Sequence, residues 1–458
     1  MNIAINGFGR IGRNAFKIAF ERPDLEVVAV NDLTDTKTLA HLLKHDSNYG
    51  AYQHDVSSDE QNINVKDQVI KVLAEKDPAE LPWKDLGVEV VIESTGLFTD
   101  PAKAKAHIDA GAKKVIISAP AKGEGAETIV LGVNEDKISG AGEVISNASC
   151  TTNSITPVMA VLEASFGIEK AMMTTIHSYT ASQVLLDGPA KDIREARNAA
   201  TNIVPTTTGA SVAAAKAFPP LEGIFGGMSI RVPTPVVSLS DFSVVIKRDV
   251  SVEEVNEALK KAAADPYYQG ILDVTEEELV SSDFIGNSHS SIVDLKLTAV
   301  VGGNLVKVVA WYDNEWGYSN RLVELTADVA RLLRSEPSEE SKSDPEEYSG
   351  EKDTESKSAK QHHTHKKDSG KGEEKIDITE PPEELLLPAP DSETQSLGDT
   401  LEKTKPSLEL NEPPAPEDDD KSAVGEDTST NGYIIGSGEK PKHSLPPDAT
   451  NIDGVHRF

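Results

Sequence analysis

Cys150 is the residue best suited to nucleophilic chemistry, and it is the only cysteine among 458 residues. Residues 142–147 read as a short strand, and from Thr151 to Phe166 apolar residues recur with the period of a helix. Free N–H groups and the dipole at a helix start favour an anion. We therefore expect a lowered pKa for the Cys150 thiol. The alternative interpretation of a lone cysteine is a small buried hydrophobic residue.

A glycine motif lies at the start of the chain, where Gly7, Gly9 and Gly12 directly follow the apolar stretch 2–6. A strand, this turn and a helix, with Asp32 twenty residues after Gly12, are typical of a dinucleotide site. Gly7 permits a tight turn, Gly9 lets a pyrophosphate approach, and Gly12 lets the helix pack on the sheet. Asp32 favours NAD over NADP because its charge repels a 2′-phosphate. A glycine turn without a ligand is the alternative.

Strands and helices alternate up to about residue 150, which predicts a doubly wound parallel sheet. Polar residues at 93–96 and 118–120 follow two of its strands, at the edge where such sheets bind ligands. The predicted strands are 88–92, 114–117, 128–131 and 143–146, and the predicted crossing helix is 101–111.

The pattern changes after residue 170 to alternating strands that suit a largely antiparallel sheet. The alternating strands are 236–248, 290–297 and 305–311, with helices at 210–217 and 252–264. Before them, 172–176 reads as a strand that ends at His177, and segment 227–232 carries Arg231. The long segment 181–205 contains Leu185, Leu186 and Ile193, so we expect an ordered loop that packs on a partner. A final helix at 315–334 has one apolar stripe, which predicts that it packs back on the first domain.

The fold class is therefore α/β: a Rossmann-type doubly wound parallel sheet plus an α+β catalytic domain with a mainly antiparallel sheet. We place the dinucleotide-binding domain at 1–149, completed by helix 315–334, and the catalytic domain at 150–314. Residues 335–458 hold 31 acidic and 14 basic residues and few apolar ones, so we expect a disordered acidic tail.

Composition excludes several classes of protein. A net charge of −31 without a basic stripe argues against a nucleic-acid partner, and no apolar run reaches the length of a membrane span. One cysteine rules out a disulfide framework and indicates a reducing compartment. The first strand begins at Asn2, which leaves no room for a cleavable signal peptide, so we expect a cytoplasmic protein. We expect no metal, because His362, His363 and His365 lack a fixed fourth ligand.

Five segments together resemble phosphorylating glyceraldehyde-3-phosphate dehydrogenase. They are 6–13 (NGFGRIGR), 149–153 (SCTTN), 174–180 (TTIHSYT), 231–235 (RVPTP) and 311–318 (WYDNEWGY). The resemblance runs in order over residues 1–334, and the tail has no counterpart in the common form of the family.

The resemblance implies oxidation of glyceraldehyde 3-phosphate with NAD and inorganic phosphate to 1,3-bisphosphoglycerate, in glycolysis or gluconeogenesis, by a homotetramer. Cys150 is then the nucleophile, which forms a thiohemiacetal and a thioester, and His177 is its base. The implied cofactor contacts are Gly7, Gly9, Arg10, Ile11, Gly12, Asp32, Lys76, Ser118 and Asn314. The implied contacts to the two phosphates are Ser149, Thr151, Thr180, Thr208, Gly209 and Arg231.

Two positions depart from the family and affect the expected ligand affinity. Glu195 stands where many bacterial relatives have an arginine, for which Arg194 or Arg197 can substitute. Lys76 stands where relatives often have an arginine near the adenine.

Two other functions stay open at this point. Erythrose-4-phosphate dehydrogenase has a similar fold and thiol chemistry, but segments 178–180 and 206–209 match the glyceraldehyde type. A scaffold that acts through residues 335–458, with secondary enzyme activity, is a hypothesis of another class. Weak competition of this anionic tail with NAD or phosphate is a further hypothesis, behind a solvating or partner-docking role.

Overall fold

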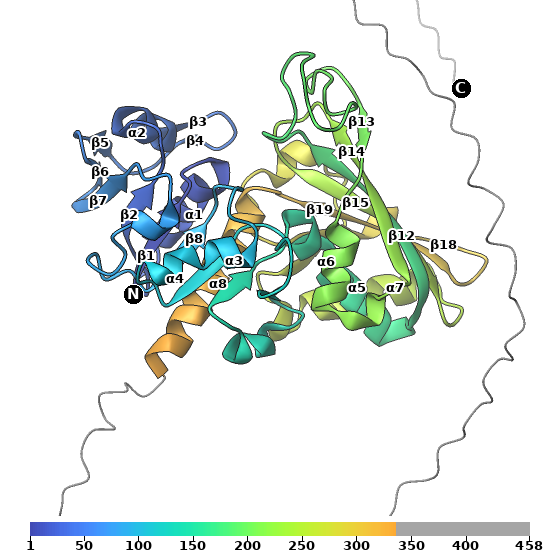
Figure 1. Ribbon diagram of the computed structural model, residues 1–458. Helices are drawn as coiled ribbons and strands as arrows, with labels where there is room; N and C mark the ends of the chain where they lie inside the picture. Colours follow the sequence, from blue (N-terminus) through green and yellow to red (C-terminus); the bar gives the residue numbers. More distant parts are fainter. Residues whose placement is uncertain (336–458) are drawn as a thin grey trace, which may run out of the picture. The chain divides into compact units, whose positions relative to one another are not determined.

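The computed structural model describes residues 1–335, which form two large sheets and one small strand pair (Figure 1). Residues 336–458, and with them the predicted acidic tail, lie outside the described residues. The small pair consists of β3 (His45–Asp46) and β4 (Gly50–Ala51). The glycine motif and its sheet come first in the chain, and the histidine and arginine segments belong to the second sheet.

The first sheet has nine strands, of which the seven from β10 to β7 run parallel. β6 and β5 add an antiparallel edge. In spatial order the strands are β10 (Glu127–Thr128), β11 (Val144–Ser146), β9 (Lys114–Ile117), β8 (Val90–Glu93), β1 (Asn2–Asn6), β2 (Glu26–Asn31), β7 (Gln68–Leu73), β6 (Asn62–Val65) and β5 (Val56–Ser58). The predicted doubly wound parallel sheet is confirmed.

The helices of this sheet differ from the prediction at one place. They are α1 (Arg10–Phe20), α2 (Thr36–Lys44), α3 (Pro101–Ala104), α4 (Ala106–Asp109) and the 3₁₀ turns η1 (Pro78–Glu80) and η2 (Glu135–Gly140). The single helix predicted over 101–111 is wrong, because Lys105 interrupts it with a ψ of −19°, a value of the tighter 3₁₀ turn.

The strand predicted over 128–131 is also shorter than expected. β10 ends at Thr128, because the side chain of Asn134 pairs with the backbone at the point where the ladder would continue. Its Oδ1 accepts from the Val130 N–H at 2.8 Å, and its Nδ2 donates to the Thr128 carbonyl at 2.8 Å.

The second sheet has eight strands and is mainly antiparallel, as predicted. Only the pairs β12–β14 and β16–β17 run parallel. The strands are β13 (Val204–Thr206), β14 (Phe225–Val232), β12 (Ile168–Ser178), β15 (Ser238–Ile246), β19 (Leu305–Tyr312), β17 (Ser291–Asp294), β16 (Leu272–Thr275) and, beside β19, β18 (Ala299–Val301). The strand predicted over 290–297 ends early, because the Asp294 side chain caps the 3₁₀ turn η6 (Leu295–Leu297).

Three helices cover one face of this sheet: α5 (Cys150–Phe166), α6 (Ala210–Ala217) and α7 (Val252–Ala263) (Figure 1). Ile155 and Val158 of α5 lie in one buried core with Phe242 of the sheet. Met172 and Leu305 are exposed although they belong to the sheet. The remaining 3₁₀ turns are η3 (Pro219–Leu221), η4 (Pro266–Tyr268) and η5 (Ser281–Phe284).

The last helix, α8 (Trp316–Ser335), returns to the first sheet (Figure 1). Its buried residues Tyr318, Leu322 and Val329 belong to the same core as Ile3 of β1 and Phe16 of α1. Apolar burial of this kind is the main favourable term in folding. The predicted packing of this helix is therefore confirmed, while the domain limits at 149/150 and 314/315 stay predictions.

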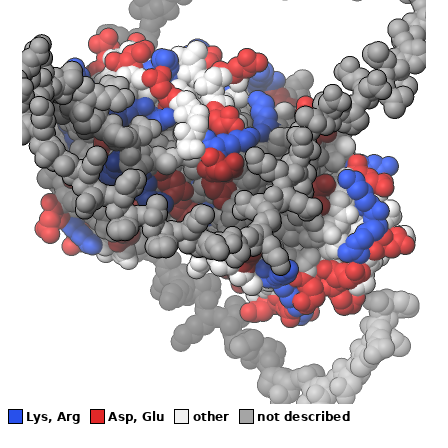
Figure 2. Space-filling model, turned by 90° about the horizontal axis from the view of Figure 1, so that it is seen from below, with Lys and Arg blue, Asp and Glu red and all other residues white. Residues whose placement is uncertain are grey.

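The surface of residues 1–335 mixes charges of both signs. Figure 2 shows Asp and Glu side chains beside Lys and Arg side chains on the face that it draws. Within these residues no helix has the length and apolar character to span a bilayer. The same part of the chain contains no group of three His, Cys, Asp or Glu residues placed to hold a metal ion.

Candidate active site

The thiol and the predicted base lie together where a helix start meets a strand end. Cys150 is the first residue of α5, and the Ser149 side chain caps this helix by accepting from the Thr152 N–H at 3.0 Å. His177 is the penultimate residue of β12. The distance from Cys150 Sγ to His177 Nε2 is 3.5 Å. The structure therefore brings the predicted nucleophile and the predicted base together, although they are 27 positions apart in the chain.

The hydrogen bonds of His177 fix which ring nitrogen faces the thiol. Nδ1 lies 2.7 Å from the Ser178 carbonyl oxygen. A carbonyl oxygen only accepts, so Nδ1 carries the proton and the neutral ring has its lone pair on Nε2. That lone pair is the group next to Sγ, and His177 is therefore oriented to accept the thiol proton.

The pKa of the Cys150 thiol is shifted in the opposite direction from the one predicted. Burial raises the pKa of the Cys150 thiol, while Arg231, Thr151 and backbone N–H groups lower it by less. Burial, and then the charge of Arg231, lower the pKa of His177 to about 3. The predicted lowering of the thiol pKa is wrong for this protein without ligands, because desolvation outweighs the helix start.

This buried histidine has a consequence for stability. Its pKa is about 3 in the folded chain against an ordinary value of 6.5, so the unfolded chain binds more protons between those pH values. The free energy of unfolding must then fall as the pH is lowered from about 6.5 towards 3. His177→Asn removes this contribution. Urea unfolding at matched protein concentration should show the stability advantage of the wild type over the variant shrinking with falling pH; a constant difference would contradict it.

Tyr312 is a buried member of the site that sequence reasoning did not single out. Its hydroxyl lies 3.0 Å from Thr151 Oγ1 and 2.8 Å from Thr175 Oγ1. Its ring meets the ring of His177 edge-to-face, with centroids 6.0 Å apart. The only signal was its place in segment 311–318. Tyr312 links the start of α5 to β12 and so helps to set the distance between Cys150 and His177.

Arg231 reaches the same site through strand pairing. β14 runs parallel to β12, with Arg231 in register with His177. Its Nη1 lies 3.4 Å from the Ser178 carbonyl oxygen, while its buried Nε has no hydrogen-bond partner among the described residues. A guanidinium with a free donor beside a thiol suits the binding of an anion.

The other predicted phosphate residues make local hydrogen bonds. Thr180, two residues after β12, has its Oγ1 2.9 Å from Ser182 Oγ. Thr208 Oγ1 accepts from the Ala210 N–H at 3.2 Å, just after Gly209, which precedes α6. The start of α6 therefore presents a hydroxyl and backbone N–H groups, as the start of α5 does.

Of the two arginines expected to substitute at position 195, Arg194 lies beside a predicted phosphate residue. Arg194 and Thr208 line the same surface hollow. Arg197 is instead engaged, with its Nε 3.0 Å from a carboxylate oxygen of Asp187. Glu195 accepts from a threonine hydroxyl of β13 at 3.1 Å, and so carries its negative charge near the same hollow.

The glycine turn between β1 and α1 fits a dinucleotide. Gly7 has a φ of +92°, and a Cβ there would lie 2.6 Å from the Thr95 nitrogen. A Cβ on Gly9 would meet no atom within 4 Å, so this side of the turn is open to a ligand. A Cβ on Gly12 would lie 2.0 Å from the Gly7 oxygen. The same Cβ would lie 3.0 Å from Ser94 Oγ, so Gly12 lets the helix approach the residues that directly follow β1 and β8 of the sheet.

Asp32 and Arg10 lie on either side of this turn. Asp32 Oδ2 accepts from the Phe8 N–H at 2.9 Å, which ties the end of β2 to the glycine turn. The Arg10 guanidinium is already engaged, by Glu315 and by Asp46 at 2.6 Å. The backbone N–H of Arg10, at the first position of α1, is the group left to face a pyrophosphate.

Asn314 lies close to the catalytic strand. It is buried, and its Oδ1 accepts from Ser178 Oγ at 2.9 Å and from Ser238 Oγ at 3.1 Å. With the oxygen held by two hydroxyls, the amide group has one orientation and its NH₂ is the part available to a ligand.

Three further predicted cofactor contacts lie around the first sheet. Ser118 follows β9, and its N–H donates to the Glu93 carbonyl at 2.9 Å. Ile11 is half-buried in α1, and Lys76 is exposed after β7. Ser118 therefore lies at the carboxyl edge of the sheet, next to the end of β8.

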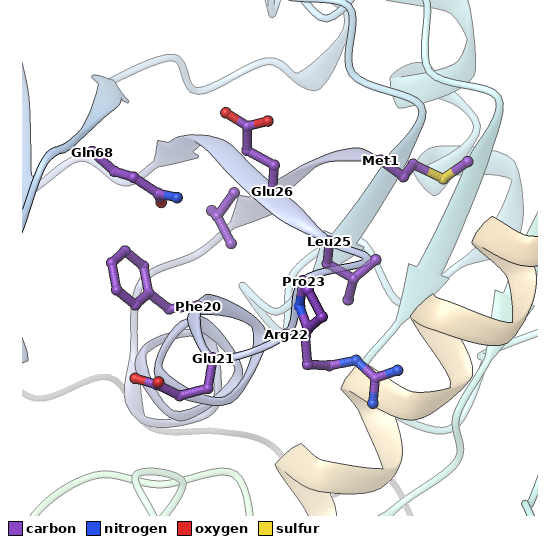
Figure 3. Close-up of a pocket in the computed structure, with 9 residues that line it drawn as sticks. Met1, Phe20, Glu21, Arg22, Pro23, Leu25, Glu26 and Gln68 are labelled. Carbon is purple, nitrogen blue, oxygen red and sulfur yellow. The ribbon is translucent and has the colours of Figure 1, made fainter.

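A separate hollow of about 400 Å³ lies at the other edge of this sheet, where β1 and β2 begin (Figure 3). Its lining residues are Met1, Phe20, Glu21, Arg22, Pro23, Leu25, Glu26, Val27 and Gln68. None of the predicted site residues belongs to this lining. Parallel sheets bind ligands at the carboxyl edge, so this hollow is not part of the candidate active site.

Comparisons with known proteins agree with this geometry. Residues 1–101 match the family model described as "Glyceraldehyde 3-phosphate dehydrogenase, NAD binding domain", and residues 149–314 match the corresponding "C-terminal domain". The chain is 54% identical over 335 residues to a glyceraldehyde-3-phosphate dehydrogenase of Streptomyces coelicolor, covering 73% of this chain and 99% of the relative. It is 55% identical over 331 residues to one of Geobacillus stearothermophilus, covering 72% and 98%.

Proposed function

Because this chain belongs to the glyceraldehyde-3-phosphate dehydrogenase family, we propose that it oxidises glyceraldehyde 3-phosphate with NAD and inorganic phosphate to 1,3-bisphosphoglycerate. It is an NAD-dependent oxidoreductase. The observation that carries the proposal is the distance of 3.5 Å between Cys150 Sγ and His177 Nε2, with Arg231 in register beside the histidine. The reaction belongs to glycolysis or gluconeogenesis.

The pair supports covalent catalysis through the thiol. Cys150 Sγ adds to the aldehyde carbon while His177 Nε2 accepts the thiol proton and returns it to the new oxygen, which gives a thiohemiacetal. His177 then takes the hydroxyl proton back as hydride leaves. NAD, when bound, supplies the hydride acceptor. The thioester on Cys150 is attacked by phosphate, and the acyl phosphate leaves as the thiolate is released.

The phosphate groups are assigned to the basic and hydroxyl groups around the thiol. Thr180 and Arg231 bind the phosphate of the substrate in this proposal. Its support is the buried Nε of Arg231, which has no hydrogen-bond partner within residues 1–335. The attacking phosphate is assigned to the hydroxyls and N–H groups at the starts of α5 and α6, which are Ser149, Thr151, Thr208 and Gly209.

NAD is assigned to the carboxyl edge of the first sheet. The open side of Gly9 and the free N–H groups at the start of α1 support a pyrophosphate there. The residues that would hold the cofactor are Gly7, Gly9, Arg10, Ile11, Gly12, Asp32, Lys76, Ser118 and Asn314. Asn314 is assigned to the carboxamide of the nicotinamide, because its amide NH₂ is the part left free.

A steady-state assay tests this function. NADH formation is followed with glyceraldehyde 3-phosphate and either NAD or NADP, in the presence and absence of phosphate. We expect continuous turnover only with phosphate, because without it the thioester on Cys150 is not released. Faster turnover of erythrose 4-phosphate than of glyceraldehyde 3-phosphate would show that erythrose 4-phosphate is the preferred substrate and would contradict the proposal.

Asp32 determines cofactor preference in this proposal. We expect the wild type to prefer NAD, and Asp32→Gly to raise the ratio of kcat/KM for NADP over NAD by roughly tenfold or more, because one like-charge repulsion is removed. Asp35→Ala is the matched control, since Asp35 caps α2 instead of the glycine turn. Equal kcat/KM values for the two cofactors in the wild type would count against the assignment.

A homotetramer is part of the proposal. The loop before β13 exposes three large apolar side chains: Leu185 is 75%, Leu186 72% and Ile193 84% exposed. A loop that faces only solvent has no need of such a group of apolar side chains, which is typical of a protein–protein contact. We expect light scattering at micromolar concentration to give about four times the chain mass of 49.1 kDa. Leu186→Asp with Ile193→Asp should lower that mass. A monomer mass for the wild type would contradict the assembly.

The cytoplasm is the proposed location. The reaction uses Cys150 as a thiol, and the cytoplasm keeps thiols reduced. The proposed domains are 1–149 with 315–334 for NAD and 150–314 for catalysis, which places Cys150 at the first residue after the boundary.

A further inference from the structure

A buried polar cluster lies below the glycine turn and has no part in the chemistry proposed above. It consists of Glu93, His107 and Trp83, whose side chains are at most 1% exposed. Glu93 is the last residue of β8, and His107 belongs to α4. A carboxylate buried to this degree needs a full set of hydrogen-bond donors, so its partners indicate what it holds in place.

The hydrogen bonds in this cluster can run in only one direction. Trp83 Nε1 only donates, and it lies 2.9 Å from His107 Nδ1. Nδ1 is therefore the acceptor and the ring proton is on Nε2, which donates to Glu93 Oε2 at 3.1 Å. The indole and imidazole rings are stacked, with centroids 6.1 Å apart. Trp83 thus fixes the tautomer of His107, and His107 fixes the Glu93 carboxylate.

The same carboxylate joins two strand ends at the dinucleotide edge. Its Oε2 also accepts from Asn6 Nδ2 at 2.5 Å, and Asn6 ends β1. Its Oε1 accepts from the Thr95 N–H at 2.8 Å and from the Thr95 hydroxyl. All four contacts come from groups that can donate, so both oxygens of the carboxylate act as acceptors.

These contacts continue into the glycine turn. Ser94, next to Glu93, donates from Oγ to the Gly7 carbonyl at 2.7 Å and from its N–H to the Asn6 carbonyl at 2.7 Å. Gly7 is so close to Thr95 that a Cβ would lie 2.6 Å from its nitrogen. The position of residues 94–95 therefore sets the position of the glycine turn.

We propose that Glu93, oriented by His107 and Trp83, is a positioning residue for NAD binding. It holds residues 94–96 against the glycine turn in the shape that receives the dinucleotide. The inference rests on the proposed function, since NAD is its ligand. Cys150 and His177 lie on α5 and β12, so loss of this anchor weakens NAD binding and leaves kcat at saturating NAD close to the wild-type value.

Calorimetric titration of the full chain with NAD alone, without aldehyde, tests the proposal. Glu93→Gln keeps the shape but loses part of the acceptor capacity, and we expect the Kd for NAD to rise by about tenfold. Trp83→Phe removes one donor and should raise it by a smaller factor. Trp311→Phe is the matched control, because Trp311 donates to Asp294 at 3.3 Å in the other sheet, and its Kd should equal that of the wild type.

Each outcome of this titration has one meaning. A wild type that binds no NAD overturns the proposed function itself. A wild type that binds NAD, with unchanged Kd values in both Glu93→Gln and Trp83→Phe, overturns the positioning role. An equal rise of the Kd for NAD in Trp311→Phe also overturns the positioning role, because loss of any buried indole donor would then weaken NAD binding. The rate of Cys150 alkylation by iodoacetamide without NAD should match the wild type in both variants; a parallel slowing would show that the anchor is not specific to the cofactor.

Discussion

Cys150→Ser should lower the oxidation of glyceraldehyde 3-phosphate by at least about a thousandfold, because loss of a covalent nucleophile is among the largest single effects in enzymes. A serine hydroxyl stays protonated near neutral pH and needs a strong base to react. The nearest base is His177, and a serine hydroxyl is far less acidic than the thiol whose proton His177 Nε2 faces, so serine forms much less of the reactive anion. The measurement is NADH formation under saturating NAD, aldehyde and phosphate.

The variant should keep its fold and its cofactor site, which separates lost chemistry from lost structure. The described side-chain hydrogen-bond contacts of Sγ are His177 Nε2 at 3.5 Å and Thr151 Oγ1 at 4.0 Å. NAD titration should therefore give the wild-type Kd. Ser154→Ala, a buried change in the same helix, is the control and should stay active. Turnover of Cys150→Ser above a small fraction of the wild type would refute the thiol mechanism.

His177→Asn should slow hydride transfer by about 10²–10⁴-fold, the usual effect of losing a positioned general base. The Nε2 lone pair faces Sγ because Nδ1 donates to the Ser178 carbonyl, and an asparagine amide has no basic lone pair to replace it. Stopped-flow measurement of the first NADH formed per active site reports this step directly.

The matched control for this variant is His289→Asn. His289 is half-buried, and its Nδ1 lies 3.0 Å from Asn287 Oδ1. Its replacement should leave the burst rate unchanged. An unchanged burst rate in His177→Asn would instead show that another group accepts the proton.

Local patterns were enough to predict the elements that carry the site. The apolar period after Cys150 predicted α5, and the strand predicted at 172–176 lies within β12. Strand order was not predictable in this way. Arg231 lies beside His177, 54 positions earlier in the chain, only because β14 pairs with β12 in parallel, and such pairing depends on the whole sheet. The predicted lowering of the Cys150 thiol pKa was wrong for a related reason, because the burial that raises this pKa depends on how the whole site packs.

The strands between α2 and η1 were missed because their turn carries an unusual residue. β6 and β7 are joined by Lys66 and Asp67, and Lys66 has a φ of +50°. The usual sequence signal of a two-residue hairpin is Asn-Gly or another turn with glycine, because glycine and asparagine adopt a positive φ at little cost. The alternation of buried residues at Ile63 and Val65 was present but too short to stand alone.

The solitary, partly accessible thiol of Cys150 also determines how this enzyme can recover from oxidative damage. A thiol oxidised to the sulfenic acid is normally rescued by a second cysteine that forms a disulfide with it. No second cysteine exists anywhere in the 458 residues. Repair of Cys150 must therefore come from a thiol of another molecule, such as a small cellular thiol, before further oxidation makes the loss permanent.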